Sequence, residues 1–167
     1  MLHVAVTVVD AREPRPLPTE VVSKAPGIRP LGRGRHSWWG ISVYDATLWV
    51  VGTAWSPSRP HALDVEPSRK VAAGTLVNTA LSEMRDLKLG DEERMKSWQR
   101  ELEQAIPSVQ PGDQVVIFCP DLDRMIVYYN SAVYRETKDP TLCPAVMNVW
   151  LHPEAKHSQV RKALLGH

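Results

Sequence analysis

The chain has 167 residues and a formal net charge of +1 at pH 7, with 43% hydrophobic and 23% charged residues. This length and composition are typical of one soluble globular domain that can bury a sizeable core. The nearly neutral charge supplies no global field that favours nucleic acid or an anionic membrane, and we expect no nucleic-acid partner.

The N-terminal residues 1–31 are predicted to stand apart from a domain at residues 32–167. The apolar run Leu2–Val9 is too short to span a bilayer, so no membrane span is expected. It is interpreted either as a first strand or as the remnant of an export signal, which would make the protein cytoplasmic or periplasmic, respectively. Repeated prolines within residues 10–31 remove backbone donors and predict an extended surface arm, with one turn of helix at Thr19–Lys24.

The strongest strand signal is the run Trp39–Val51, which is rich in β-branched and aromatic residues. Alternate side chains of a strand point to opposite faces. One face would carry Ile41, Val43, Asp45, Thr47, Trp49 and Val51, and the other would carry Ser42, Tyr44, Ala46, Leu48 and Val50. Both faces are largely apolar, which predicts a central strand covered on both sides.

Later patterns predict further groups of helices and strands. Thr75–Leu89 carries an apolar stripe at helical spacing with Thr75 as its cap, and Asp91 begins a second helix that ends at Pro107. The other predicted elements are strands at His61–Val65, Gln114–Cys119, Met125–Tyr129 and Ala132–Arg135, and helices from Asp139 or Cys143 to Leu151 and from Ser158 to Gly166. This order of strands and helices predicts an α+β fold.

Four stretches, taken in order, resemble one known family. Within residues 32–49 a G-x-G is followed by an aromatic residue, a glycine and the sequence Val-Tyr-Asp-Ala-x-Leu-Trp. The later stretches are Leu81–Arg85, Val109–Asp113, and Val149–Pro153 followed by Leu164–Gly166. Over roughly residues 17–167 the chain resembles the bacterial branch of the chalcone isomerase-like family. The resemblance implies an antiparallel sheet with helices packed on one face, and a ligand cleft between the sheet and the helices.

A basic cluster surrounds the two glycines of this motif. Its members are Arg29, Arg33, Arg35 and His36, beside Gly32 and Gly34. Glycine lets a backbone approach a ligand closely, and guanidinium groups bind carboxylates in a bidentate manner. We therefore expect Arg35, with Arg33 or His36, to hold an anionic head group; the alternative is an exposed basic turn. Trp39, Tyr44 and Met84 are candidates for the apolar wall of the same site.

The residues that the family's enzymes use for catalysis are not matched. The resemblance places their substrate-binding arginine at His36 and a strand threonine at Trp39, and the helix predicted at Thr75–Leu89 has no tyrosine. Chalcone cyclisation is therefore not expected, and no catalytic residue is assigned. Relatives of the fold without those residues include fatty-acid-binding proteins, so the resemblance implies a non-catalytic protein that binds a fatty acid or similar apolar carboxylate. The alternatives are an isomerase or intramolecular lyase for a conjugated carbonyl compound, and a structural protein with a closed cleft.

No cofactor and no metal site are expected. The remaining histidines are scattered, without an i, i+4 pair on a helix, and the two cysteines lack the spacing of zinc ligands. Cys119 and Cys143 would pair in an exported protein or remain as buried free thiols, and we favour free thiols.

Overall fold

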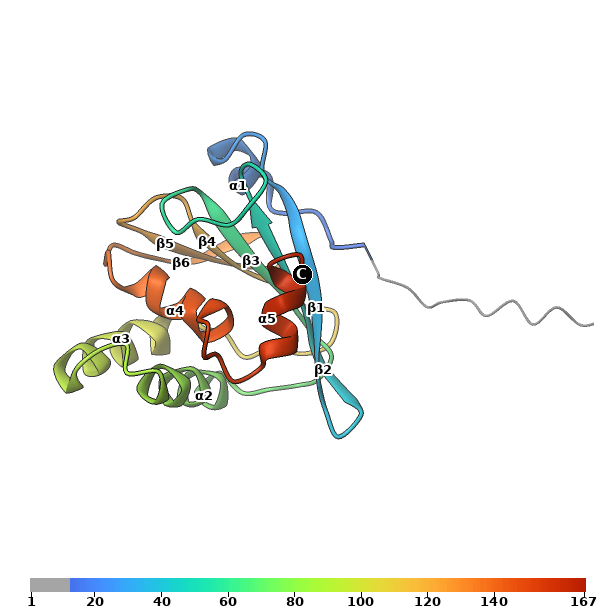
Figure 1. The fold of residues 1–167 in the computed structure, drawn as a ribbon. Helices are drawn as coiled ribbons and strands as arrows, with labels where there is room; N and C mark the ends of the chain where they lie inside the picture. Colours follow the sequence, from blue (N-terminus) through green and yellow to red (C-terminus); the bar gives the residue numbers. More distant parts are fainter. Residues whose placement is uncertain (1–12) are drawn as a thin grey trace, which may run out of the picture.

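The computed structural model describes residues 13–167. The run Leu2–Val9, predicted to be a first strand or a signal remnant, lies outside the described residues. The described chain folds as one antiparallel sheet with a layer of helices on it, which confirms the predicted α+β class (Figure 1). No helix in this part of the chain is long and apolar enough to cross a membrane.

The sheet of residues 13–167 contains six strands in chain order, and every neighbouring pair is antiparallel. The strands are β1 (Arg29–Trp38), β2 (Ile41–Val50), β3 (His61–Pro67), β4 (Val115–Cys119), β5 (Met125–Tyr129) and β6 (Ala132–Thr137). The predicted meander at the end of the sheet is confirmed as β4, β5 and β6. Because the order is sequential, β1 and β6 are the edges of the sheet.

Within the described chain, four helices cover one face of the sheet, which we call the helix face. They are α2 (Ala73–Asp86), α3 (Glu92–Ala105), α4 (Leu142–Leu151) and α5 (Ser158–Leu164). The predicted cap of α3 is confirmed, since Asp91 accepts a hydrogen bond from the backbone N–H of Arg94 at 2.8 Å. In contrast, α2 begins two residues before Thr75, so Thr75 is not its cap. The last helix, α5, returns to pack on β1 and β2.

The opposite face of the sheet, which we call the outer face, is partly covered by the helix predicted near the N-terminus. This helix is α1 (Thr19–Lys24). Leu17, Val21 and Ala25 are buried there against β3, β4 and β5. The helical turn predicted at Thr19–Lys24 is confirmed, but the prediction that the chain around it lies extended on the surface is wrong for the buried Leu17 and Ala25. The prolines exclude a long helix, but the apolar residues between them supply enough contact area to hold the segment on the sheet.

The Gly/Arg segment is a strand and not a turn. It forms most of β1, which pairs with β2 from Arg29–Val50 to Trp38–Ile41. The predicted domain boundary between residues 31 and 32 lies inside β1. Prolines and glycines have low strand propensity, which conceals this edge strand in the sequence. β2 is therefore the second strand of the sheet. The prediction that it is covered on both sides is wrong for its first half, which begins with the exposed Ile41 and is only partly buried.

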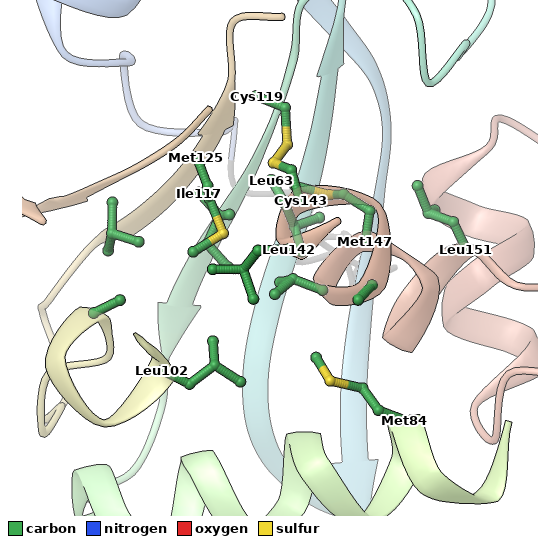
Figure 2. Packing of buried hydrophobic residues seen from close by; sticks show 14 of the residues in the cluster. Leu63, Met84, Leu102, Ile117, Cys119, Met125, Leu142, Cys143, Met147 and Leu151 are labelled. Carbon is green, nitrogen blue, oxygen red and sulfur yellow. A yellow bond between two sulfur atoms is a disulfide. The ribbon is translucent and has the colours of Figure 1, made fainter. Parts of the chain in front are cut away.

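The main hydrophobic core lies between the sheet and the helix layer (Figure 2). The predicted apolar stripes of α2 and α3 face this core. Its buried members include Leu63, Ile117 and Met125 from the strands and Met84, Leu102, Leu142, Met147 and Leu151 from the helices. These side chains fill the space in which the resemblance places a ligand cleft.

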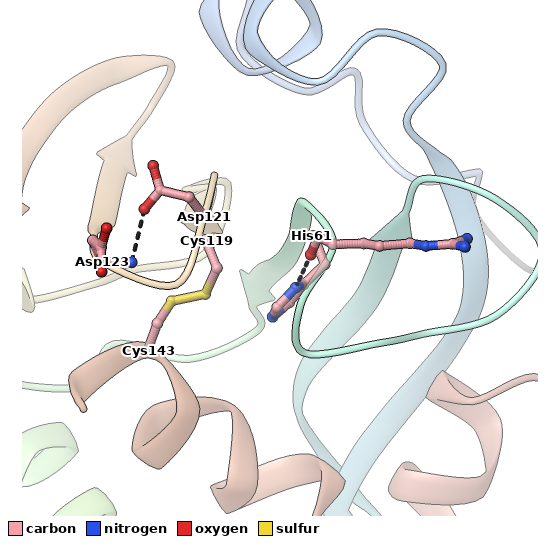
Figure 3. The surroundings of a disulfide bond; sticks show 6 residues. His61, Cys119, Asp121, Asp123 and Cys143 are labelled. Carbon is pink, nitrogen blue, oxygen red and sulfur yellow. Dashed lines mark hydrogen bonds between the residues drawn. A yellow bond between two sulfur atoms is a disulfide. The ribbon is translucent and has the colours of Figure 1, made fainter. Parts of the chain in front are cut away.

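A disulfide joins Cys119 at the end of β4 to Cys143 on α4 (Figure 3). The Cα atoms are 6.2 Å apart, within the range that a disulfide spans. The prediction of free thiols was wrong. Whether the two cysteines meet depends on how α4 docks beside β4, and the sequence spacing does not contain this information.

Candidate functional site

The predicted ligand residues of β1 and β2 lie on both faces of the sheet. The cross-strand pairs that contain them are Arg33–Thr47, Arg35–Asp45 and His36–Tyr44. Residues that are directly opposite on neighbouring strands share a face. The two arginines therefore point to the outer face, whereas the histidine and the tyrosine point toward the helices.

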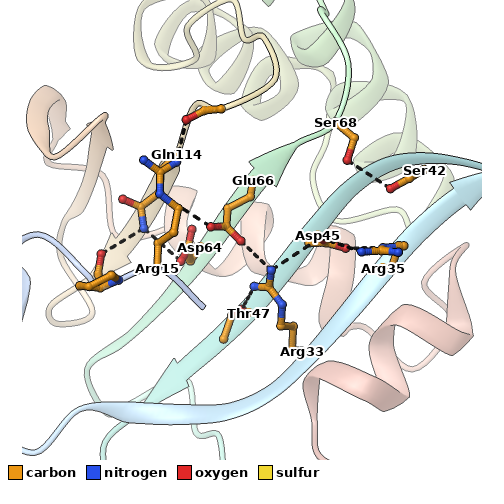
Figure 4. Close-up of polar contacts among 12 residues, drawn as sticks. Arg15, Arg33, Arg35, Ser42, Asp45, Thr47, Asp64, Glu66, Ser68 and Gln114 are labelled. Carbon is orange, nitrogen blue, oxygen red and sulfur yellow. Dashed lines mark hydrogen bonds and ion pairs between the residues drawn. The ribbon is translucent and has the colours of Figure 1, made fainter. Parts of the chain in front are cut away.

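On the outer face, the two arginines are held by carboxylates of neighbouring strands (Figure 4). The Nη2 atom of Arg33 is 2.7 Å from Glu66 Oε2, and its Nη1 donates a hydrogen bond to Thr47 Oγ1 at 2.7 Å. The Nε atom of Arg35 is 2.7 Å from Asp45 Oδ1. The Arg33 side chain is 16% exposed, but that of Arg35 is 53% exposed. These residues form a ladder of alternating charge across β1, β2 and β3.

The glycines of β1 face the helices and allow α5 to approach. A Cβ atom at Gly32 would overlap the backbone carbonyl oxygens of Ala163 and Leu164. A Cβ atom at Gly34 would lie 3.2 Å from the Cβ of Ala163. The missing side chains therefore serve the close packing of a helix on an edge strand. In this structure a helix, and not the predicted ligand, approaches these glycines.

A polar cluster lies on the helix face, and we call it the Tyr44 cluster. The Nε1 of Trp150 donates a hydrogen bond to the Tyr44 hydroxyl at 3.0 Å. The His36 ring lies 5.3 Å from the Tyr44 ring and 4.0 Å from the His157 ring, measured between centroids. The Nε2 of His157 is 3.9 Å from Glu83 Oε1. The cluster therefore combines residues from β1, β2, α2, α4 and the N-cap of α5.

Burial determines the protonation of this cluster. It raises the pKa of Tyr44 to about 12, against the smaller effect of the Trp150 hydrogen bond, which lowers it. Burial also lowers the pKa values of His36 and His157 and raises that of Glu83. At pH 7 the cluster thus presents a neutral hydroxyl and two neutral imidazoles. Each of these groups can donate a hydrogen bond without carrying a positive charge.

Trp39 and Met84 lie apart from the Tyr44 cluster. Trp39 is at the tip of the β1–β2 hairpin and is 84% exposed, whereas Met84 is fully buried in the main core (Figure 2). The six predicted site residues therefore occupy four places: the outer face, the Tyr44 cluster, the hairpin tip and the core. Their participation in ligand binding stays a prediction.

Comparison with known proteins relates the fold, but not the sequence, to a described protein. No family model and no curated protein matches the sequence. The solved structure of a fatty-acid binding protein from Arabidopsis thaliana superposes with a TM-score of 0.64 and 12% sequence identity, covering 85% of this chain and 88% of that chain. The fold is chalcone isomerase-like. The predicted fold is confirmed; the relation to the bacterial branch stays a prediction.

In this chalcone isomerase-like fold, three members of the Tyr44 cluster were not predicted as site residues. Trp150 lies 106 positions after Tyr44 in the chain. His157 and Glu83 belong to other elements, and no local sequence pattern connects them to Tyr44. One signal was present in the sequence. Had β1 been identified as a strand, its alternation would have placed His36 on the face of Tyr44.

The chalcone isomerase-like sheet also buries a carboxyl group that the sequence did not single out. Asp64 on β3 is fully buried on the outer face. Its Oδ2 accepts a hydrogen bond from Gln114 Nε2 at 3.1 Å, and its Oδ1 has no hydrogen-bond partner among the described residues. Burial raises its pKa to about 7, and the bond from Gln114 opposes this shift. The same Gln114 amide donates to the carbonyl of Pro16 at 3.2 Å, which ties the N-terminal segment to the sheet (Figure 4).

A shallow hollow of about 540 Å³ lies between the N-terminal ends of α3 and α4. Leu89, Trp98 and Pro144 contribute apolar walls, with Arg94 at the side. The Thr141 hydroxyl accepts hydrogen bonds from Trp98 Nε1 at 3.0 Å and from Arg94 Nη1 at 3.2 Å. The polar groups of the hollow thus bind one another. As for metals, residues 13–167 contain no group of three or more His, Cys, Asp or Glu side chains arranged to hold an ion.

Proposed function

We propose that the protein binds an apolar molecule with a carboxylate head group, such as a fatty acid, with the Tyr44 cluster as the head-group site. The observation that carries this proposal is the Tyr44 hydroxyl, which is fixed by Trp150 Nε1 at 3.0 Å. Because the indole N–H occupies one lone pair of the oxygen, the hydroxyl proton remains for donation to an acceptor. A pKa of about 12 keeps that proton in place at physiological pH.

The position of the cluster supports the same proposal. It lies between the sheet and the helices of a fold shared with a fatty-acid binding protein. An apolar tail would have to enter the main core, where Met84 on α2 and Met147 on α4 are buried. Methionine side chains are flexible and adapt to irregular spaces. We therefore expect these two residues to move when a tail is accommodated.

The charges around the head-group site predict how binding depends on pH. Burial raises the pKa of Glu83 and lowers the pKa values of His36 and His157. Lowering the pH therefore protonates Glu83 and both imidazoles, which removes a repulsive charge and adds two attractive ones. The affinity for an ionised carboxylate ligand should therefore increase as the pH falls below the ordinary histidine value of 6.5, because burial lowers the pKa values of both imidazoles from that value.

The test is titration of the purified chain with long-chain fatty acids, by calorimetry or by displacement of a fluorescent fatty acid. Tyr44→Phe should weaken binding by about 10- to 100-fold, because a hydrogen bond to a charged group contributes about 1.5–3 kcal/mol. Arg35→Met, on the outer face, is the matched control and should bind as the wild type does. Thermal unfolding of each variant excludes a folding defect.

Two results would contradict this proposal. Absence of fatty-acid binding by the wild-type chain would exclude the function itself. Loss of binding in Arg33→Met or Arg35→Met, with Tyr44→Phe unaffected, would instead support the head-group site predicted from the basic cluster. The same experiment therefore distinguishes the two faces of the sheet.

A further inference from the structure

The β1–β2 hairpin ends in a two-residue loop whose sequence opposes its backbone conformation. Trp38 is paired with Ile41, so Trp39 and Gly40 form the loop. Their φ angles are 52° and 74°, and positive φ at both positions is the pattern of a type I′ turn. Asn-Gly is the preferred pair in such a turn, whereas a bulky side chain in the left-handed region is strained. Strain of this kind is expected where a side chain has a function other than folding.

The same loop carries apolar side chains into solvent. Trp39 is 84% exposed and the neighbouring Ile41 is 48% exposed. The loop projects from the end of the sheet, past α5 (Figure 1). Large apolar residues exposed together at a projecting point indicate an interaction surface. Tryptophan in particular favours the boundary between water and lipid, because its ring is apolar and its N–H is polar.

Cationic side chains lie beside the base of this tip on the β3 side. Arg69 and Lys70 are exposed and follow Ser68 directly. The Ser68 hydroxyl is 3.1 Å from the Ser42 hydroxyl on β2 (Figure 4). The two cations are therefore held within a few residues of the hairpin loop.

A third cation lies on the other side of the hairpin. Lys156 is exposed and precedes His157, whose ring contacts that of His36 on β1. The carboxylates of this region are Glu83, which lies 3.9 Å from the imidazole of His157 and is partly buried, Asp45, which belongs to the outer-face ladder, and Glu154, which is exposed two residues before Lys156. We call Arg69, Lys70 and Lys156 the basic collar.

We propose that the hairpin tip docks the protein on an anionic lipid surface, with Trp39 and Ile41 among the headgroups and the basic collar against the lipid phosphates and carboxylates. A net charge of +1 provides no long-range attraction, so the collar must supply the electrostatic contribution locally. One aromatic anchor with a few cations gives weak and reversible attachment. The docking is independent of fatty-acid binding, although it would bring the Tyr44 cluster, on the same hairpin, close to the lipid.

The test is sedimentation of the full chain with vesicles of phosphatidylcholine, with and without phosphatidylserine. The wild type should bind the phosphatidylserine vesicles. Trp39→Asn should reduce the partition constant by about 10-fold, because it removes the largest exposed apolar side chain. Its unfolding temperature should be unchanged or higher, because Asn-Gly suits the turn. A structural role of Trp39 would instead lower the unfolding temperature. Leu122→Asn, at an exposed leucine between β4 and β5, is the matched control and should bind normally.

The double variant Arg69→Gln/Lys70→Gln tests the collar. It should bind phosphatidylserine vesicles about 10-fold more weakly and behave as the wild type toward phosphatidylcholine alone. Tyr44→Phe should retain vesicle binding, which separates failure of this proposal from failure of the fatty-acid proposal. The proposal is overturned if the wild type does not bind anionic vesicles, or if Trp39→Asn binds them with the partition constant of the wild type. It is also overturned by a dimer that depends on Trp39 and forms without lipid binding, since the tip would then be a protein contact.

Discussion

The two faces of the β1–β2 hairpin share one backbone and differ in their chemistry. On the outer face, Arg33 and Arg35 lie opposite carboxylates of β2 and β3, so their charges are matched within the sheet. On the helix face, His36 and Tyr44 meet neutral partners, and the tyrosine hydroxyl retains its proton for donation. An arginine cluster in a sequence is therefore not by itself an anion site. Its capacity to bind depends on which residues the neighbouring strands place across from it.

The largest effect is expected from disrupting the close contact between β1 and α5 on the helix face. Gly32→Val would place a side chain against the carbonyl groups of Ala163 and Leu164. Since backbone cannot move aside without displacing α5, we expect the free energy of unfolding to fall by about 4 kcal/mol or more. Urea unfolding followed by circular dichroism measures this change. Gly74→Ala, at a helical position with open space around it, is the control and should be neutral or slightly stabilising. An unchanged stability in Gly32→Val would contradict the packing of α5 on β1.

A second large effect is expected at the buried carboxyl group of the outer face. The pKa of Asp64 is raised from 3.8 to about 7 in the folded protein, so between these pH values the folded state keeps a proton that the unfolded state releases. This group therefore lowers stability progressively as the pH rises from about 4 to about 7, by at most about 4 kcal/mol. Asp64→Asn cannot titrate. The difference in unfolding free energy between wild type and variant should change over this interval and be constant above pH 8.

Other titrating groups do not obscure this measurement, because they are present in both proteins and cancel in the difference. His61, whose pKa is lowered by burial, is one such group. A difference that stays flat from pH 4 to 8 would show that Asp64 has an ordinary pKa, and therefore that the outer face is open to water at this position.

A smaller effect is expected within the outer-face ladder, where the two arginines differ in burial. Arg33→Met leaves Glu66 and Asp45 facing each other in a partly buried site, and should lower the unfolding free energy by about 2–3 kcal/mol. Arg35→Met removes a more exposed ion pair and should have an effect below about 1 kcal/mol. Both values come from chemical denaturation at the same salt concentration. Equal losses in the two variants would indicate that the ladder is uniformly exposed.

Local periodicity in the sequence was sufficient for much of the fold. The alternation within residues 41–50 predicts the two faces of β2, and those faces are found as predicted. The apolar stripes predict α2 and α3, and Asp91 marks the start of α3. These features depend on neighbours in the chain, since the period of a helix or strand and the reach of a cap are local properties.

Only the tertiary structure decided the site. β1 resembles a loop in the sequence because glycine and proline disfavour strands, and its pairing with β2 and its packing against α5 override that preference. The meeting of Tyr44 with Trp150, the disulfide between Cys119 and Cys143, and the burial of Asp64 all join segments that are distant in the chain. Strand order and helix docking set these contacts through packing of the whole domain, and no local pattern of residues carries that information.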